Sequence, residues 1–309
     1  MLHVRVIAPE GIRREVLAVL RDQAGVTDIV LHPGAALEPA GDEITADVAR
    51  ESVNDLVQAL KDLDVQHCGA ITLAVLDTVL SSQAHLAQDE AEGEPADALV
   101  WDELIARTRD ESTLSVTFVM FLTLACLLAA IGAVTDSMVT VVGAMIVGPE
   151  FGPLAALSVA IVQRRGRLAR RAATALLVGF PVAMGITAVV TVATVAAGWL
   201  SLDTVAHINQ VNFIFRVGPI SFVVALLAGA AGMLSLVSSK SASLVGVFIS
   251  VTTVPAAGFA VVAAILGDFG IAARSAAQLA VNVVGIVLAG VLVLALRPSR
   301  HDTPRPAAT

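Results

Sequence analysis

Polar and apolar positions in residues 1–78 follow first the alternating spacing of strands and then the spacing of helices. From Leu2 to Ala8 the two kinds of residue alternate, which predicts a half-buried strand, and from Glu10 to Ala24 apolar residues recur at helical spacing. The same criteria predict the remaining elements: strands at 26–31, 43–49 and 70–75, a turn at 32–41 and a helix at 53–63. The chain therefore begins with a small α+β domain.

The order strand–helix–strand–strand–helix–strand is that of a ferredoxin-like fold. ACT-like regulatory modules, which bind amino acids, have this order, but so do many unrelated proteins. The predicted order therefore indicates a regulatory kind of domain without naming its ligand.

Six apolar segments follow within residues 113–297, and each is long enough for the roughly 20 residues that a membrane span requires. They lie near 115–134, 139–162, 172–197, 217–237, 243–266 and 276–296. A hydrophobic content of 56% for the whole chain is above that of soluble proteins. We therefore expect an α-helical polytopic membrane protein with about six spans, followed by a disordered cytoplasmic tail at 298–309.

Residues 79–112 connect the two parts and have their own composition. Ser81 to Ala98 are acidic and poor in large apolar side chains, which predicts a linker. Leu99 to Arg109 have apolar residues at helical spacing, which predicts an amphipathic helix. This helix either leads into the membrane, with Trp101 near the interface, or packs on the soluble domain.

Charge divides the chain in the same place. Residues 1–112 carry 8 Lys and Arg against 22 Asp and Glu, whereas the rest carries 11 against 5. Such an acidic domain repels a phosphate backbone, which argues against nucleic acid as a partner. Five arginines separate the second and third segments, and the positive-inside rule assigns them to the cytoplasm: Arg164, Arg165, Arg167, Arg170 and Arg171. Alternation from there puts both termini in the cytoplasm, with the spans in the bacterial cell membrane.

The chain offers little for catalysis or metal binding. Its two cysteines, Cys68 and Cys126, form neither a disulfide framework nor a Cys-based metal site. No His-Glu-x-x-His motif, pair of intramembrane aspartates or Ser/His couple occurs. We therefore expect no enzyme activity, no catalytic residue, no cofactor and no metal.

The second apolar segment is interrupted by a polar and helix-breaking sequence. It contains Gly148, Pro149, Glu150, Phe151, Gly152 and Pro153 in succession. Proline removes a backbone donor and crowds the preceding turn, so a continuous helix is disfavoured. A carboxylate is costly in hydrocarbon and suits reversible protonation or cation binding there. The segment is therefore predicted to be a broken membrane helix with Glu150 at the break.

A shift of 103 residues aligns the second and third segments with the fifth and sixth. Val142 then meets Val245 and Arg171 meets Arg274. With three spans in each unit, the halves would be an inverted repeat, as in many secondary transporters. A second interruption, formed by Thr252, Thr253 and Pro255, then matches the first. These residues, with the first break and Asn282 in the sixth segment, are the predicted solute or ion pathway.

Each of these features also has a structural interpretation. Prolines kink membrane helices for packing alone, and some of the aligned identities arise by chance in a chain rich in Ala and Val. Glu150 could line a water-filled vestibule or pair with Arg216 or Lys240. Asn282 and the threonines could simply hydrogen-bond neighbouring helices.

The stretch GAMIVGPEFGPL resembles a signature of the bacterial family called domain of unknown function 389, or uncharacterised hydrophobic domain. RVGPISFVVALLAGAAGMLSL, SLVGVFISVTTVPAAG and AVNVVGIVLAG are similar to later blocks of that family, and the similarity covers most of residues 100–297. Glu150 and Phe151 stand where many members have Leu-Met, which the resemblance implies is a feature of a subgroup. The resemblance implies a polytopic membrane protein with a regulatory-looking N-terminal domain, but no substrate.

Taken together, these patterns favour a transporter or channel for a small solute or ion, assembled as a homo-oligomer in the lipid bilayer. The soluble domain would sense a ligand or mediate assembly. The alternative is a membrane-anchored sensor or scaffold without transport, whose spans only hold an oligomer together.

Overall fold

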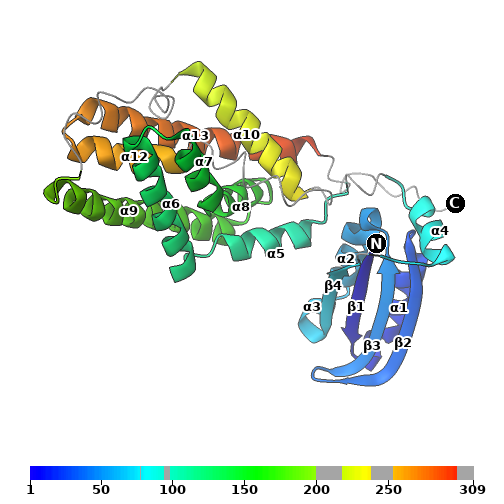
Figure 1. Cartoon of the computed structure of the whole chain (residues 1–309). Coiled ribbons are helices and arrows are strands. Elements are labelled where there is room, and N and C mark those ends of the chain that lie inside the picture. Colours follow the sequence, from blue (N-terminus) through cyan, green and yellow to red (C-terminus); the bar gives the residue numbers. More distant parts are fainter. Residues whose placement is uncertain (77, 94–97, 200–217, 238–252, 298–309) are drawn as a thin grey trace. The chain divides into compact units, whose positions relative to one another are not determined.

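The computed structural model describes residues 1–76, 78–93, 98–199, 218–237 and 253–297, and these form two compact units. The first unit ends at Leu104 and the second begins at Ile105 (Figure 1). The expected tail at 298–309 and part of the expected fifth span, 243–252, lie outside the described residues.

The first unit contains the predicted order of strands and helices. Its antiparallel sheet has the order β2-β3-β1-β4, and its strands are β1 Leu2–Ala8, β2 Val26–Leu37, β3 Ala40–Val48 and β4 Ala70–Val75. Helices α1 Arg13–Asp22 and α2 Val53–Asp62 each follow a short 3-10 turn, and a single-turn helix, α3 Val65–Cys68, precedes β4. The apolar sides of the sheet and of α1 and α2 form one core.

Strand β1 explains why this sheet has one buried face. Its even-numbered residues, from Leu2 through Val4 and Val6 to Ala8, are buried because alternate side chains of a strand point to the same side. On the other side His3 Nδ1 lies 2.7 Å from Asp47 Oδ1, and Arg5 pairs with Glu43. The apolar and polar alternation seen in the sequence thus marks the two faces.

The turn expected at 32–41 is wrong except at residues 38 and 39, because β2 continues to Leu37 and β3 begins at Ala40. Pro33 and Gly34 suggested the turn, but they occupy an irregularity where the pairing of β2 with β3 shifts between His32 and Ala36. The backbone N–H of Gly34 donates to Asp42 Oδ1 at 2.7 Å, which replaces a ladder hydrogen bond. A bulge of this kind admits a proline and a glycine within a strand.

The segment expected to be a linker contains a helix, α4 Ser82–Glu90. The hydroxyl of Ser81 accepts a hydrogen bond from Ala84 N at 3.3 Å and so caps its first turn. Ala84 and Ala87 are buried, and α4 contacts β2 and β3. The composition misled the prediction because a helix that buries alanines needs no large apolar residues.

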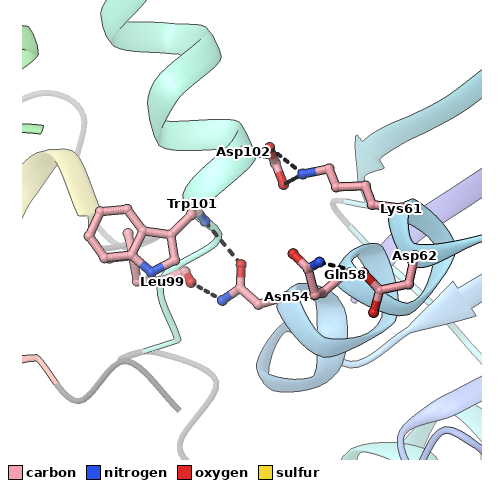
Figure 2. Close-up of polar contacts among 7 residues, drawn as sticks. All are labelled: Asn54, Gln58, Lys61, Asp62, Leu99, Trp101 and Asp102. Atoms are coloured by element: carbon pink, nitrogen blue, oxygen red, sulfur yellow. Dashed lines mark hydrogen bonds and ion pairs between the residues drawn. The ribbon is translucent and has the colours of Figure 1, made fainter. Parts of the chain in front are cut away.

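Helix α5, Trp101–Glu111, starts against α2 of the first unit, in agreement with one of the two interpretations of this segment. Asn54 on α2 donates to Leu99 O at 2.6 Å and accepts from Trp101 N at 3.1 Å (Figure 2). Lys61 also reaches Asp102 at 2.8 Å. Asn54 therefore satisfies a backbone donor at the helix start, where α-helices leave such groups open.

The second unit consists of helices that are long or strongly apolar. They are α6 Val116–Val134, α7 Met138–Val147, α8 Phe151–Val162, α9 Gly166–Ala196, α10 Pro219–Val237, α12 Thr253–Ile265 and α13 Phe269–Leu296. Four of them, α6, α9, α10 and α13, are long and apolar enough to cross a membrane. The bent pair α7 and α8 makes a fifth if it counts as one span.

Large apolar side chains cover the outside of these helices. Exposed examples are Ile131 on α6, Leu177 and Val189 on α9, Leu227 on α10 and Leu292 on α13. In water so many exposed aliphatic side chains would be unfavourable, whereas lipid tails accept them. The surface therefore agrees with the composition: this unit is built to associate with a membrane.

Inside the unit, α12 is the central helix. It contacts α6, α7, α9 and α13, and every residue from Thr253 to Ala263 is buried. Figure 1 shows α12 between α9 and α13. Packing against these helices fixes the position of α12 in the unit. It thereby also fixes the position of Thr253, the first residue of α12.

Helix boundaries in the two halves of the unit recur at one spacing. Both ends of α6 and α10 differ by 103 residues, from Val116 and Val134 to Pro219 and Val237. Helices α8 and α12 end 103 residues apart, at Val162 and Ile265, and α9 and α13 start 103 residues apart. The correspondence of α6 with α10 played no part in the sequence alignment.

The short turns that follow α8 and α12 also correspond in their backbone geometry. Arg164 and Gly267, 103 residues apart, both have positive φ, at 51° and 90°. The next residue donates in each case to the carbonyl five residues earlier, Arg165 N to Ala160 O and Asp268 N to Ala263 O, both at 2.9 Å. The same turn thus ends both helices although the residues differ.

Replacing Asn54 by Ala is expected to loosen the start of α5. The variant loses both hydrogen bonds to the backbone around Trp101, at a cost of about 1–3 kcal/mol. Hydrogen–deuterium exchange of the amides from Leu99 to Glu103 should then become faster by about tenfold or more. The control is Gln58→Ala, because Gln58 is exposed and bonds only to Asp62 on its own helix. Equal exchange in both variants would contradict the role of Asn54.

Candidate functional site

The helix is interrupted between α7 and α8, as the Gly/Pro sequence predicts. The two helices are bent by 52°, and only Gly148, Pro149 and Glu150 lie between them. Gly148 has extended backbone angles and donates to Ala144 O at 3.2 Å, which is the last hydrogen bond of α7. Pro149 has no N–H to continue that ladder, so the helix ends here.

The break is narrower than the predicted one. Gly152 and Pro153 lie in the first turn of α8, where a missing N–H removes no helical hydrogen bond. A Cβ on Gly152 would lie 2.7 Å from Glu111 Cβ and 3.0 Å from Glu111 O. Gly152 therefore serves close packing of α8 on the end of α5 rather than the interruption itself.

The second interruption is described only from Thr253 onward. Thr253 is the first residue of α12, and Pro255 is the third, so Pro255 also occupies a first helical turn. Thr252 lies outside the described residues. Both prolines, Pro153 and Pro255, are fully within helix starts and buried.

Glu150 and Thr253 meet at the centre of the unit. The hydroxyl of Thr253 donates to Glu150 Oε1 at 2.6 Å, and both residues have no solvent exposure. The short distance is typical of a hydroxyl that donates to a carboxylate. The bond joins the two predicted breaks through positions that are 103 residues apart.

The two residues also stand at the N-terminal ends of two helices. Glu150 precedes the first residue of α8, where its backbone carbonyl accepts from Leu154 N at 3.3 Å, and Thr253 opens α12. Helix N-termini carry partial positive charge and favour a nearby carboxylate. The arrangement can therefore stabilise a negative charge on the buried Glu150 carboxylate. The same carboxylate can bind a proton or a cation, which neutralises its charge.

Asn282 lies in another polar group. It is fully buried on α13 and accepts from Gln278 Nε2 at 3.1 Å. The same nitrogen of Gln278 also contacts Ser221 Oγ on α10. Of the predicted pathway residues, Glu150 and Thr253 are thus directly bonded, whereas Asn282 bonds to Gln278, the residue of α13 that contacts Ser221 on α10.

Ser158 and Ser221 are two polar residues that the sequence analysis missed. Ser158 on α8 donates to Val287 O on α13 at 3.1 Å, next to Gly290, whose Cβ would lie 2.5 Å from Ser158 Oγ. A single serine in an apolar run carries little signal by itself. Spacing could have helped, because small residues such as Gly285 and Gly290 mark the facing helix.

Replacing Thr253 by Val is expected to destabilise the second unit. Valine keeps the shape but removes the donor to a buried carboxyl group, at a cost of about 1.5–3 kcal/mol. The apparent melting temperature of the detergent-solubilised protein should fall. Thr187→Val is the matched control, because buried Thr187 donates only to Ala183 O of its own helix, and it should cost under about 1 kcal/mol. A Thr253 variant no less stable than the control would contradict this hydrogen bond.

The comparisons with known proteins agree with the motifs. The family model described as Domain of unknown function (DUF389) matches residues 145–288. An uncharacterised protein of Methanocaldococcus jannaschii is 29% identical over 170 residues, which cover 54% of this chain and 50% of that protein. This chain thus matches only half the length of this relative. No solved structure matches this chain. The matched region, residues 145–288, holds the break and both helix starts, so it is in this part that the chain is similar to the DUF389 family.

Proposed function

We propose that this protein is a transporter or channel for a small solute or ion, with Glu150 as the residue that binds a proton or cation. The observation that carries the proposal is the buried hydrogen bond from Thr253 to Glu150 between two helix N-termini. Ionisable groups at membrane depth are costly and mark pathways in many transporters. No catalytic role is proposed for any residue.

An inverted repeat of three plus three spans is part of this proposal. Its support is the spacing of 103 residues, which recurs in α6 and α10, in α8 and α12, and in α9 and α13. With an odd number of spans in each unit, the second unit has the opposite orientation in the membrane. Broken helices at equivalent places of such repeats form the substrate sites of several transporter folds.

The two breaks would then form one site at the repeat interface. A proton or small cation that binds Glu150 neutralises the carboxylate and weakens its attraction to the starts of α8 and α12. Because α12 contacts α6, α9 and α13, a shift of its first turn changes the packing of both halves. Binding at Glu150 is thereby linked to a movement of one repeat against the other, as alternating access requires.

The soluble unit is proposed to be a ferredoxin-like regulatory domain. The sheet order β2-β3-β1-β4, with all pairs antiparallel, and the two helices that share its core support this fold. Its role would be to sense a ligand or to hold a homo-oligomer together. The chain would lie in the bacterial cell membrane with about six spans and both termini in the cytoplasm.

Glu150→Gln is expected to reduce flux. The glutamine side chain keeps the shape but neither binds a proton nor attracts a cation, so transport coupled to Glu150 should fall by about tenfold or more. The full-length protein in proteoliposomes would be assayed with internal dyes for H⁺, Na⁺, K⁺ and Cl⁻ under an imposed potential. Thr187→Val should leave flux unchanged, since Thr187 bonds only within α9.

The outcome of this assay separates transport from other functions. Protein that reconstitutes as a stable assembly but moves none of the four ions or a panel of small solutes would sink the transporter proposal. A membrane-anchored sensor or scaffold would then be the better explanation. Flux that is unchanged by Glu150→Gln would keep transport but remove Glu150 from the pathway.

The proposed orientation can be tested with the native cysteines. Cys68 is exposed on the soluble unit, whereas Cys126 is buried in α6. A membrane-impermeant maleimide should therefore label inverted membrane vesicles but not intact spheroplasts, and Cys68→Ser should abolish the labelling. Labelling of Cys68 in spheroplasts would contradict a cytoplasmic N-terminal domain.

A further inference from the structure

Four arginines converge on an open cavity of about 580 Å³ in the second unit. The cavity lies between the second half of α5 and the start of α9. It is lined by Ile105, Arg109, Arg165, Gly166, Arg167, Leu168 and Arg171. No acidic side chain is part of this lining.

These guanidinium groups have no carboxylate within 4 Å among the described residues. Arg107, on the same helix as Arg109, differs, because it lies 3.3 Å from Glu111, and Arg50 likewise pairs with Glu103 at 2.8 Å. The positive charges around this cavity repel one another, and a bound anion would offset that repulsion because it attracts each guanidinium group. The lining therefore has the charge of an anion site that supplies no counterion of its own.

Membrane orientation alone does not explain this arrangement. Arg109 belongs to α5, before the first span, and not to the basic loop between α8 and α9. Arg164 in that loop and Arg170 in the first turns of α9 lie outside the lining, although they serve the positive-inside rule equally well. The convergence of Arg109 with the other three arginines is a feature of the fold.

Two further features of the cavity indicate which kind of anion it would bind. Leu168 is buried and, with Ile105, gives the cavity an apolar part beside its charged part. Gly166 leaves open space at the start of α9, and Arg165, the N-cap residue, makes no side-chain hydrogen bond to the N–H groups of the first turn. Guanidinium groups match the oxygen pairs of phosphate in a bidentate manner, and open N–H groups at a helix start add donors for the same oxygens.

We propose that this cavity binds a phosphate group. The cavity lies beside the first turns of α9, just before the apolar part of that helix. If α9 spans the membrane, the cavity is at the membrane surface. Phosphate is available there from two sources. One is the headgroup of an anionic phospholipid, whose glycerol and first acyl carbons fit the apolar part. The other is a soluble phosphate or diphosphate.

Full-length protein would be studied in two arms. In the first, the protein is placed in nanodiscs of phosphatidylcholine with increasing phosphatidylglycerol. In the second, it stays in a neutral detergent and is titrated with inorganic phosphate or pyrophosphate against sodium chloride of equal ionic strength. Binding raises the melting temperature of the folded protein, which is the measured quantity in both arms.

Adjacent residues provide the matched variants. Arg171→Gln removes a lining guanidinium and should weaken the fitted phosphate affinity by about tenfold, whereas Arg170→Gln removes an equal charge next to it and should change it by less than about twofold. On α5, Arg109→Gln and Arg107→Gln form a second pair with the same expectation. Gel filtration of each variant confirms that it remains assembled.

The results assign the source or overturn the site. Stabilisation only by phosphatidylglycerol identifies a lipid headgroup, stabilisation only by phosphate or pyrophosphate identifies a soluble ligand, and stabilisation in both arms supports a general phosphate site. Absence of stabilisation in both arms overturns the proposal. Equal losses in the two members of each arginine pair also overturn it, because the effect would then come from the general charge of the surface.

Discussion

Polar groups that water cannot reach must find their partners within the protein, and this requirement determines the centre of the second unit. Pro149 ends α7, so α8 must begin anew among buried residues and leaves its first N–H groups without helical acceptors. A carboxylate is favoured at such a helix start. The hydrogen bond from Thr253 then fixes the start of α12 beside it, at 2.6 Å from Glu150 Oε1.

Close packing of small residues brings the helices near enough for this contact. Between lipid-covered helices there is no hydrophobic driving force, so dispersion and shape complementarity decide which helices associate. A Cβ on Gly258 of α12 would lie 2.6 Å from Cys126 O on α6, and one on Gly229 of α10 would lie 2.6 Å from Ile286 Cα on α13. Larger residues there would move α12 or α10 outward. The position of α12, and with it of Thr253, therefore depends on the close approach that Gly258 allows to α6.

The sequence predicts what local chemistry determines. Strands β1 and β4 have the predicted bounds, because alternation of apolar residues records one buried face, and the break beside Glu150 follows from Pro149. The extension of β2 was missed because a bulge satisfied Gly34 through Asp42, a residue eight positions away. Helix α4 was missed because it packs on the sheet with alanines, whose hydrophobic signal is weak. Periodicity along the sequence does not predict features such as these, because they depend on contacts with residues far away in the chain.

The position of the partner of Glu150 was nevertheless contained in the spacing of 103 residues. The shift of 103 residues aligns Glu150 with Thr253, and the structure brings these same positions into contact. An identical pair of carboxylates there would repel at hydrogen-bond distance in a medium of low dielectric constant, unless they shared a proton. A hydroxyl at one of the two positions removes the repulsion and supplies a donor, so Thr253 favours the burial of Glu150.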